Sequence, residues 1–349
     1  MVVSTATVNV VYVGDSDAQD VSILQLNSDG TLTPRATVAV HRPARPGRSM
    51  LLAASHDRTL LYVGYLSAEA RSSVATYAIE PRTGLLAPRG AAELPEVVSH
   101  LSLDRSGRFL FAASYAGNKV TVNAIRSDGT VGETLQVLAT EAKAHCIMAD
   151  PQNRTVLHTA LGADVVRQDG FDAASGRLLP IDPPAIAGRP HAGPRYLVFS
   201  RDGRFVYVIN ELDGTLDAYP YDPVLGRLQP SIQSITVLPP GFAGKPSAAD
   251  LHLTPDGRFL YGSERSGSTL TAFRVDAGSG TLTPIGTFAT ARQPRAFDID
   301  PAGRYLVASG QLSDSVVSHA IDPRDGRLTV VGEYPVGKNP LAVLIVGLA

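Results

Sequence analysis

GPRYLVFSRDGRFVYVINEL, residues 193–212, is the stretch from which the fold can be inferred. Its two apolar runs, YLVF and FVYVI, flank an Asp-Gly turn, which is a pattern typical of a β-hairpin. In a hairpin, residues equidistant from the turn face each other, and Gly203 is the midpoint between Arg195 and Glu211. The sequence therefore predicts that these opposite charges meet at the end of the hairpin far from the turn.

The turn of this hairpin and the strand after it recur along the chain. A turn that ends in Arg and leads into an apolar strand occurs six times, at intervals of 46–54 residues, and a degenerate seventh copy, TVNVVYVG, occupies residues 7–14. A second turn motif, built on Gly, recurs seven times in phase with the first. The arginines of the first motif are Arg58, Arg108, Arg154, Arg204, Arg258 and Arg304, and the glycines of the second are Gly30, Gly84, Gly129, Gly176, Gly226, Gly280 and Gly326.

Repeated units of this length, made of short strands and Gly or Asp turns, are the signature of a β-propeller. We therefore expect an all-β fold, a seven-bladed β-propeller that forms a single domain over residues 1–349. The first unit lacks an inner strand, whereas the last segment, NPLAVLIVG (339–347), reads as an inner strand with nothing after it. The first blade is therefore expected to be closed by the C-terminal strand, which would leave no open sheet edge.

The composition narrows the classes of function. The formal net charge is −2, so there is no basic surface to predict binding to nucleic acid or to an anionic membrane. The longest apolar run, at the C-terminus, is too short to span a bilayer, and the N-terminus has no basic leader, so we expect a cytoplasmic protein. The single cysteine, Cys146, is interpreted as a core residue. No metal-ligand spacing or nucleotide motif is found, so no metal and no cofactor is predicted, and the oligomeric state is left open, a monomer being one possibility.

The two charged positions of residues 193–212 can be compared across all repeats. Nine residues before the motif arginine stand Ser49, Ser99, His145, Arg195, Ala249 and Arg295, and seven residues after it stand Tyr65, Tyr115, Leu161, Glu211, Arg265 and Gln311, with Asp15 assigned to the first blade. Mostly polar residues at the ends of otherwise apolar strands predict the lining of a water-filled channel mouth. A wet channel or a structural Arg–Glu clasp would also explain them, but a structural ring would tend to repeat one residue type, and this one does not.

Three further stretches can be read together with residues 193–212: AHCIMADPQNRT (144–155), SAADLHLTPDGRFLYGSER (247–265) and QPRAFDIDPAGRYLVASGQ (293–311). In these four stretches the chain resembles the seven-bladed propeller lactonases, among them the bacterial propeller-type 6-phosphogluconolactonases. The resemblance covers nearly the whole chain in order. It implies a lactonase whose catalytic residues are His145, Arg195, Glu211 and Arg295 and whose substrate-binding residues include Tyr115, Asn118 and Gln311. Arg265, which is found by its place in the ring, is added to the predicted substrate-binding residues. The His-Ser pair of the bacterial enzymes is His145-Cys146 here.

Lactone hydrolysis needs a base for the attacking water, positive charge for the oxyanion and a proton for the leaving alcohol. Arginines can bind the oxyanion or an anionic substrate, and His145 is the preferred general base, although Glu211 could be the base or could orient Arg195. The favoured interpretation is metal-independent hydrolysis of an anionic sugar lactone, with 6-phosphogluconolactone the first choice. A carboxymuconate-type cycloisomerase, a lactonase for a non-phosphorylated lactone and a non-catalytic interaction propeller remain as alternatives.

Overall fold

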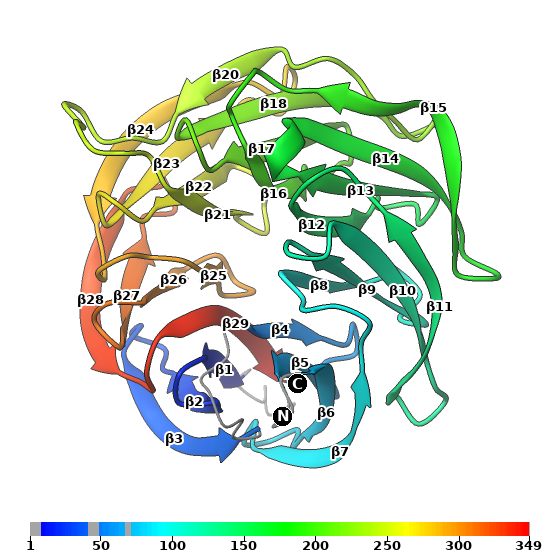
Figure 1. The fold of residues 1–349 in the computed structure, drawn as a ribbon. Coiled ribbons are helices and arrows are strands. Elements are labelled where there is room, and N and C mark those ends of the chain that lie inside the picture. The colour runs from blue at the N-terminus through cyan, green and yellow to red at the C-terminus, as the bar shows by residue number, and fades with distance from the viewer. Residues whose placement is uncertain (1–7, 41–48, 67–70, 349) are drawn as a thin grey trace, which may run out of the picture.

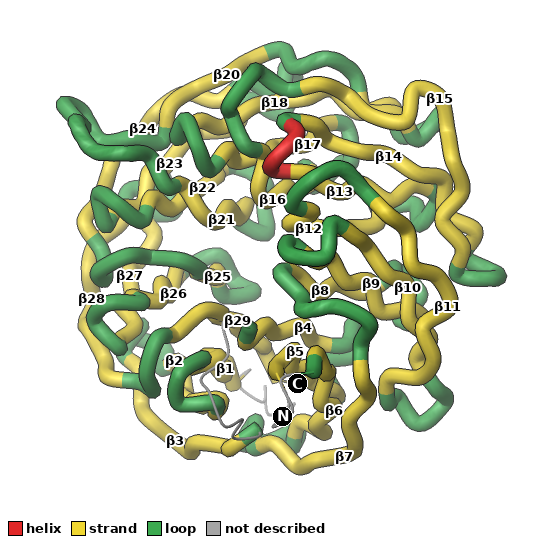
Figure 2. The backbone as a smooth tube through the Cα atoms, viewed as in Figure 1, coloured by secondary structure: helices red, strands yellow, loops and turns green. Residues whose placement is uncertain are grey.

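Seven β-sheets stand around a central channel in the computed structural model, which describes residues 8–40, 49–66 and 71–348. In Figure 1 the sheets follow one another around the ring in chain order, and the first and last described strands lie in the same blade. Figure 2 shows that strands make up most of the chain and that the connections lie at the two ends and the outer edge of the ring. The predicted seven-bladed propeller is therefore confirmed.

Each blade is an antiparallel sheet. For each blade below, the strand that borders the channel is given first. Blade 1 contains β29 (Pro340–Leu348), β1 (Val8–Asp15), β2 (Asp20–Leu26) and β3 (Leu32–Ala39); blade 2 contains β4 (Met50–Ala54), β5 (Leu60–Leu66), β6 (Ser72–Ile79) and β7 (Leu86–Glu93); blade 3 contains β8 (His100–Leu103), β9 (Phe109–Ser114), β10 (Lys119–Ile125) and β11 (Val131–Ala139); blade 4 contains β12 (Ala144–Ala149), β13 (Thr155–Ala160), β14 (Val165–Asp172) and β15 (Arg177–Ala187). Blade 5 contains β16 (Pro194–Phe199), β17 (Phe205–Asn210), β18 (Thr215–Asp222), β19 (Arg227–Leu228) and β20 (Gln233–Thr236); blade 6 contains β21 (Ala248–Leu253), β22 (Phe259–Glu264), β23 (Thr269–Val275) and β24 (Leu282–Ala289); blade 7 contains β25 (Phe297–Ile299), β26 (Tyr305–Gly310), β27 (Ser315–Ile321) and β28 (Leu328–Pro335), and a 3-10 helix, η1 (Leu161–Ala163), follows β13.

The C-terminal strand closes the ring as the sequence predicted. β29 pairs with β1 along its length, from Val8 opposite Leu348 to Asp15 opposite Pro340. Blade 1 is thus built from both ends of the chain, and β1 has a partner on each side. Because a paired strand presents no open edge, this closure protects the sheet from pairing with other chains.

The core lies between neighbouring blades. The second strand of a blade is covered on both faces, and every residue of β9, β13, β17 and β22 is buried. This explains why these strands read as continuous apolar runs instead of alternating ones. Burial on both faces is what makes the turn-and-strand motif so visible in the sequence.

The two repeated turns hold neighbouring blades together. Gly280, with φ of +73°, lies against the ring of Phe205 in the preceding blade, so a Cβ at this position would clash with the ring. The motif arginines act nearby: Arg204 and Arg258 donate hydrogen bonds to the carbonyl oxygens of Ala277 (2.6 Å) and Pro323 (2.9 Å) in the next blade. These contacts account for the regular repetition of both motifs.

The place assigned to Asp15 in the predicted ring differs from its place in the structure. The β1–β2 ladder pairs Asp15 with Asp20, which is the register place that Asn210 holds opposite Thr215 in blade 5. Asp15 is fully buried, and its Oδ2 accepts a hydrogen bond from Ser22 at 2.6 Å. It is therefore one residue out of step with Glu211. The degenerate first copy has no motif arginine from which to count, and the offset assigned to this blade was wrong by one position.

Replacing Asp15 by asparagine is expected to stabilise the protein above neutral pH. Burial, together with the nearby charge of Asp20, raises the pKa of Asp15 to about 7 from an ordinary value of 3.8. The folded state therefore binds an extra proton between these values, and the stability falls as the pH rises from about 4 to about 7. The asparagine side chain would stay neutral, so the Tm at pH 8 should rise by at least about 3 °C, with little difference at pH 4.

Thermal unfolding at the two pH values, followed by circular dichroism, checks this expectation. Asp29→Asn is the matched control in the same blade, because Asp29 is an exposed turn residue whose pKa is lowered by its hydrogen bonds to Thr31. It should give no gain at pH 8. An Asp15→Asn protein that is less stable than the wild type at pH 8 would contradict the interpretation.

Candidate active site at the mouth of the channel

Four inner strands, β12, β16, β21 and β29, are bulged where they begin. In β16 the ladder passes from Pro194 to Tyr196 while the partner strand advances by one residue, so Arg195 is the extra residue. β12 and β21 are bulged at the same place, and the bulge of β12 contains His145. A bulge interrupts the alternation of a strand and re-aims the side chain of the extra residue. The bulges therefore distinguish these positions from the rest of the inner strands.

Arg195 and Glu211 meet across the hairpin, as the sequence predicted. Arg195 Nε lies 3.0 Å from one oxygen of Glu211, and Nη2 of Arg265, from the next blade, lies 2.9 Å from the other oxygen. Burial raises the pKa of Glu211, but the charges of Arg195 and Arg265 outweigh it, and the pKa stays below its ordinary value. One carboxylate thus balances two guanidinium groups and remains ionised.

The guanidinium of Arg195 is buried, and it has two further contacts besides Glu211. Its side chain is 1% exposed, its Nη1 donates to the carbonyl oxygen of Ala249, and its Cζ lies 4.6 Å from the centre of the Tyr196 ring. Cation–π contact and a bond to a backbone carbonyl compensate part of the cost of removing the charge from water. Arg195 is therefore a rigid cation at a fixed place.

Two buried nitrogens of this group have no hydrogen-bond partner among the described residues, Nη2 of Arg195 and Nδ1 of His145. Nε of Arg195 and Nη2 of Arg265 are ion-paired with the carboxylate of Glu211. Because buried polar atoms are normally bonded, unpartnered polar atoms at one place are typical of a site that binds a ligand.

His145 lies among aromatic rings and positive charges. Its ring makes edge contacts with Tyr196 and Tyr115, with centroids 5.2 and 5.9 Å apart. Burial holds its pKa well below the usual value, and the nearby charges of Arg195 and Arg295 lower it further. The imidazole is therefore neutral at physiological pH, the state that a general base requires.

Arg295 is half-buried, and its guanidinium makes no ion pair or hydrogen bond with another described residue. Burial lowers its pKa to about 10, and Arg195 and Arg265 add to the effect. Besides burial, the charges of Arg195 and Arg265 lower the pKa of both Arg295 and His145, so the four groups lie within electrostatic range of one another. We call His145, Arg195, Glu211, Arg265 and Arg295 the mouth cluster.

Three further predicted residues lie around the mouth cluster. Tyr115 is 38% exposed and touches His145 through its ring. Asn118 is exposed, and its Oδ1 accepts a hydrogen bond from the backbone N–H of Lys143 at 2.7 Å. Gln311 donates from Nε2 to Oδ1 of Asn339 at 3.0 Å, in the segment that leads into β29. Asn118 and Gln311 therefore support the segments that enter the channel.

The remaining positions of the predicted ring do not face the site with charged groups. The hydroxyl of Ser99 donates to backbone carbonyl oxygens, including that of Ala144 at 3.0 Å. The hydroxyl of Ser49 donates to the carbonyl oxygen of Val98 at 3.2 Å. Tyr65 and Leu161 are buried. The functional candidates are thus concentrated on blades 3 to 7.

Deeper in the channel, the inner strands enclose a cavity of about 210 Å³. Its polar lining includes His100, Tyr196, Asp250, His252 and Asp298, none of which was singled out from the sequence. His252 lies 3.4 Å from Asp250 and 3.7 Å from Asp298. Burial lowers the pKa of His252, but the two carboxylates outweigh it and raise the pKa to about 9.

The two carboxylates also join neighbouring blades. Asp250 accepts a hydrogen bond from the backbone N–H of Phe297 at 3.1 Å, and Asp298 accepts one from that of Ile345 at 2.7 Å. The His252 group therefore connects β21, β25 and β29 and acts as a structural support beneath the mouth. These residues could have been found from the sequence by the same counting. Asp250 stands eight positions before the motif arginine of its blade, and His252 and Asp298 each stand six positions before theirs.

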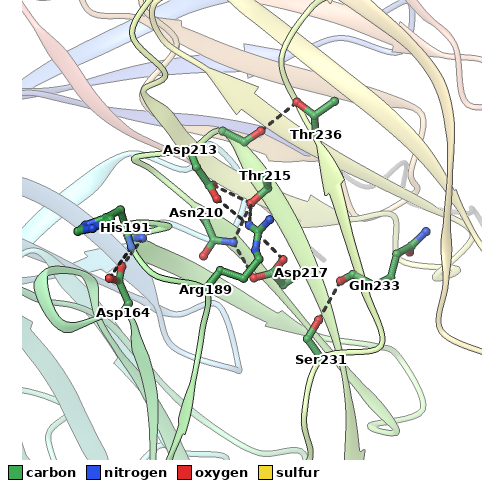
Figure 3. A network of polar contacts seen from close by, with 12 residues as sticks. Asp164, Arg189, His191, Asn210, Asp213, Thr215, Asp217, Ser231, Gln233 and Thr236 are labelled. Atoms are coloured by element: carbon green, nitrogen blue, oxygen red, sulfur yellow. Dashed lines mark hydrogen bonds and ion pairs between the residues drawn. The ribbon is translucent and has the colours of Figure 1, made fainter.

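A second polar network supports the two segments that carry Arg195 and Glu211 (Figure 3). The carboxylate of Asp164 accepts hydrogen bonds from the backbone N–H groups of His191 (2.7 Å) and Gly193 (2.8 Å), just before Arg195. Arg189 pairs with Asp213 at 2.7 Å, in the hairpin that begins with Glu211. The network fixes the loop and the hairpin relative to each other.

Two general properties complete the description. Among the described residues, no three His, Cys, Asp or Glu side chains are grouped so that they could hold a metal ion. No helix in the described part of the chain is long and apolar enough to cross a membrane. Cys146 is buried in the core between β12 and β16, as expected.

The fold and the mouth can now be compared with known proteins. The family profile "Lactonase, 7-bladed beta-propeller" matches residues 2–345. The chain belongs to this lactonase family. Among curated relatives, a 6-phosphogluconolactonase of Serratia proteamaculans is 37% identical over 291 residues, which cover 83% of this chain and 85% of that protein. A 6-phosphogluconolactonase of Pectobacterium atrosepticum is 38% identical over 295 residues, with coverage of 83% and 84%.

Solved structures of this lactonase family agree with the fold. A periplasmic gluconolactonase of Pseudomonas aeruginosa superposes with a TM-score of 0.89 at 27% identity, over 98% of this chain and all of that chain. A putative 6-phosphogluconolactonase of Bacteroides fragilis gives a TM-score of 0.86 at 24% identity over 99% of both chains, which shows a shared fold. The names of these relatives include both phosphorylated and plain sugar lactones.

Proposed function

We propose that the mouth cluster hydrolyses a phosphorylated sugar lactone, with 6-phosphogluconolactone as the substrate and 6-phosphogluconate as the product. The observation that carries the proposal is the convergence of the buried, unpartnered nitrogens of Arg195 and His145 with the ion-paired Arg265 and the guanidinium of Arg295, which is unpaired among the described residues. Such a site suits an oxyanion next to an attacking water. The curated 6-phosphogluconolactonases to which the chain is similar support the same substrate.

In the proposed mechanism, neutral His145 accepts a proton from water as its oxygen bonds to the lactone carbonyl carbon. The negative charge that develops on the carbonyl oxygen is stabilised by Arg295 and Arg195, which stay protonated throughout. The bond from the carbonyl carbon to the ring oxygen then breaks, and His145 returns the proton to that oxygen, which becomes a hydroxyl. The carboxylic acid product releases its own proton to solvent.

Glu211 has a different role in this scheme. Both of its oxygens are occupied by arginines, and its lowered pKa makes it a poor base. Glu211 therefore orients Arg195 and Arg265 and offsets part of their mutual repulsion. The lowered pKa of Glu211 therefore favours His145 as the proposed base.

The positive charge at the mouth favours an anionic substrate. Glu211 is paired with two arginines, Arg195 and Arg265, whereas Arg295 has no paired carboxylate among the described residues. The second carboxylate near Arg265, that of Glu264, accepts hydrogen bonds from the backbone N–H groups of Ser247 (2.7 Å) and Gly267. An anionic lactone would be attracted by this excess of positive charge, and the attraction should weaken as salt is added. A plain sugar lactone would use only the oxyanion contacts.

The test is a panel of lactones assayed with the purified protein. We expect kcat/KM for 6-phosphogluconolactone to exceed that for glucono-1,5-lactone by about tenfold or more, which is the scale of one additional charge-assisted contact, and to fall as salt is raised. Equal turnover of both lactones would show that the positive charge of the mouth does not select a phosphorylated substrate. Turnover of a carboxymuconolactone with neither sugar lactone hydrolysed would favour the cycloisomerase.

Two further expectations belong to this proposal. Since the positive charge is supplied by arginines, treatment with EDTA should leave the rate unchanged, and a loss of rate that calcium or zinc restores would contradict the mechanism. A cytoplasmic location, where a phosphorylated sugar substrate would be found, is part of the same proposal. Cell fractionation tests it, since one relative is named a periplasmic gluconolactonase.

A further inference from the structure

Lys143 is an exposed cation at the edge of the mouth, two residues before His145. Its ammonium nitrogen lies 5.6 Å from the centre of the Tyr115 ring, and the same ring touches His145. The ring of Tyr115 therefore lies between the proposed base and this lysine and contacts both. A substrate lying over Tyr115 would reach both residues.

The backbone of Lys143 adopts a conformation that lysine rarely takes. Its φ is +65°, a left-handed value that favours Gly or Asn. The corresponding residues two positions before the ring, Gly193 and Gln293, and Asn339 before β29, also have positive φ, but none of them is charged. Left-handed non-glycine residues cluster at ligand-binding sites because the surrounding structure must compensate the strain.

The surrounding structure holds Lys143 at several points. Asn118 Oδ1 accepts its backbone N–H at 2.7 Å, and the N–H of Leu161 donates to its carbonyl oxygen at 3.0 Å. The side-chain stem runs close to Gly162, where a Cβ would lie 3.0 Å from Cδ of Lys143. The backbone of Lys143 is thus held in place, and its side-chain stem packs beside Gly162.

The ammonium group of Lys143 has no carboxylate within ion-pair distance among the described residues. The acidic residues of this rim are engaged elsewhere: Glu141 pairs with Arg167 at 2.9 Å, and Glu96 pairs with Lys119. By contrast, Lys338, which precedes β29 on the same rim, is neutralised by Asp314 at 2.6 Å. Lys143 therefore presents uncompensated charge next to His145.

We propose that Lys143 binds the phosphate group of the substrate, with Tyr115 as the platform beneath the sugar and Asn118 as the residue that positions Lys143. This assignment rests on the proposed function and adds the residue that selects phosphorylated over plain lactones. The arginines of the mouth cluster serve the carbonyl end of the substrate, and Lys143 serves the other end. A lysine ammonium is a suitable point charge for a phosphate oxygen.

The experiment compares Lys143→Met with the wild type on 6-phosphogluconolactone and on glucono-1,5-lactone. KM for the phosphorylated lactone should rise about tenfold or more, the scale of one lost charge-assisted hydrogen bond, while kcat and both constants for the plain lactone stay within about twofold. Lys143→Arg should keep most of the preference. Lys338→Met, the matched control, should change neither lactone.

Asn118 is tested in the same assay. Asn118→Ala should raise KM for the phosphorylated lactone alone, whereas Asn118→Ser should restore it, since Ser268 holds this place in blade 6 and accepts the N–H of Gln293 at 3.1 Å. A general structural role would raise KM for both lactones or lower the Tm. Equal effects of Asn118→Ala and Asn118→Ser would overturn the positioning role.

Calorimetric binding of the products 6-phosphogluconate and gluconate separates this proposal from the proposed function. If Lys143→Met weakens binding of 6-phosphogluconate but not of gluconate, the phosphate assignment stands even where the wild type hydrolyses neither lactone, and only the proposed reaction fails. If Lys143→Met binds 6-phosphogluconate as tightly as the wild type, the assignment of Lys143 is overturned whatever the activity.

Discussion

Replacing His145 by alanine lowers kcat/KM for the sugar lactone by about 10²-fold or more, the effect expected for the loss of a general base. The side chain is buried and its ring packs against Tyr115 and Tyr196 of the two neighbouring blades, so its removal should cost some stability without preventing folding. The Tm should therefore shift by only a few degrees. Arg295→Ala should cause a loss of similar size, because it removes charge from the developing oxyanion.

The pH dependence of the wild type provides an independent test of His145. Its pKa is held well below the usual value of 6.5 by burial and by the neighbouring arginines. The neutral base therefore persists as the pH falls through 6.5, and kcat/KM should stay level there and decline only in more acidic solution. Arg304→Met is the control for His145→Ala. Arg304 is a turn residue at the other end of blade 7, so the activity of this variant should match the wild type. A retained rate in His145→Ala would refute the role of the base.

Removing residues 339–349 should prevent folding. The truncation takes away β29, whose buried side chains include Leu341, Val343, Ile345, Val346 and Leu348. Each buried aliphatic side chain contributes about 1.5–3 kcal/mol, so the loss is comparable with the whole stability of a typical domain, about 5–15 kcal/mol. β1 would also lose its hydrogen-bonded partner and expose an edge.

Soluble yield and thermal unfolding measure this outcome. We expect aggregation or the loss of a cooperative transition above room temperature. A full-length chain with Ile345→Val is the mild control, for which a drop of about 0.5–1.5 kcal/mol is expected because the strand pairing is intact. A truncated chain with the wild-type Tm would show that closure by β29 does not stabilise the ring.

Much of the fold follows from the sequence because its repeats reflect packing. The second strand of each blade is covered on both faces, so its apolar run is conspicuous, and the turns before and after it touch the next blade. The complementary defects of the first and last units were sufficient to predict that β29 joins β1. The error at Asp15 arose where the repeat has no motif arginine to fix its register.

The mouth was partly predictable for the same reason. Counting from the motif arginine brought together Arg195, Glu211 and Arg265, which the structure joins through ion pairs. The bulges in β12 and β16 and the contacts of Tyr196 leave no comparable trace, because they depend on ladder register and on rings from different blades. The left-handed backbone of Lys143 was equally invisible before the fold was known.

The most direct measurement of the central claim is a crystal structure of the protein with 6-phosphogluconate. We predict the carboxylate of the product within hydrogen-bond distance of Arg295, near His145, and its phosphate on Lys143 over the ring of Tyr115. A product bound at the opposite end of the channel, or between blades 4 and 5 beside Arg189, would contradict this prediction.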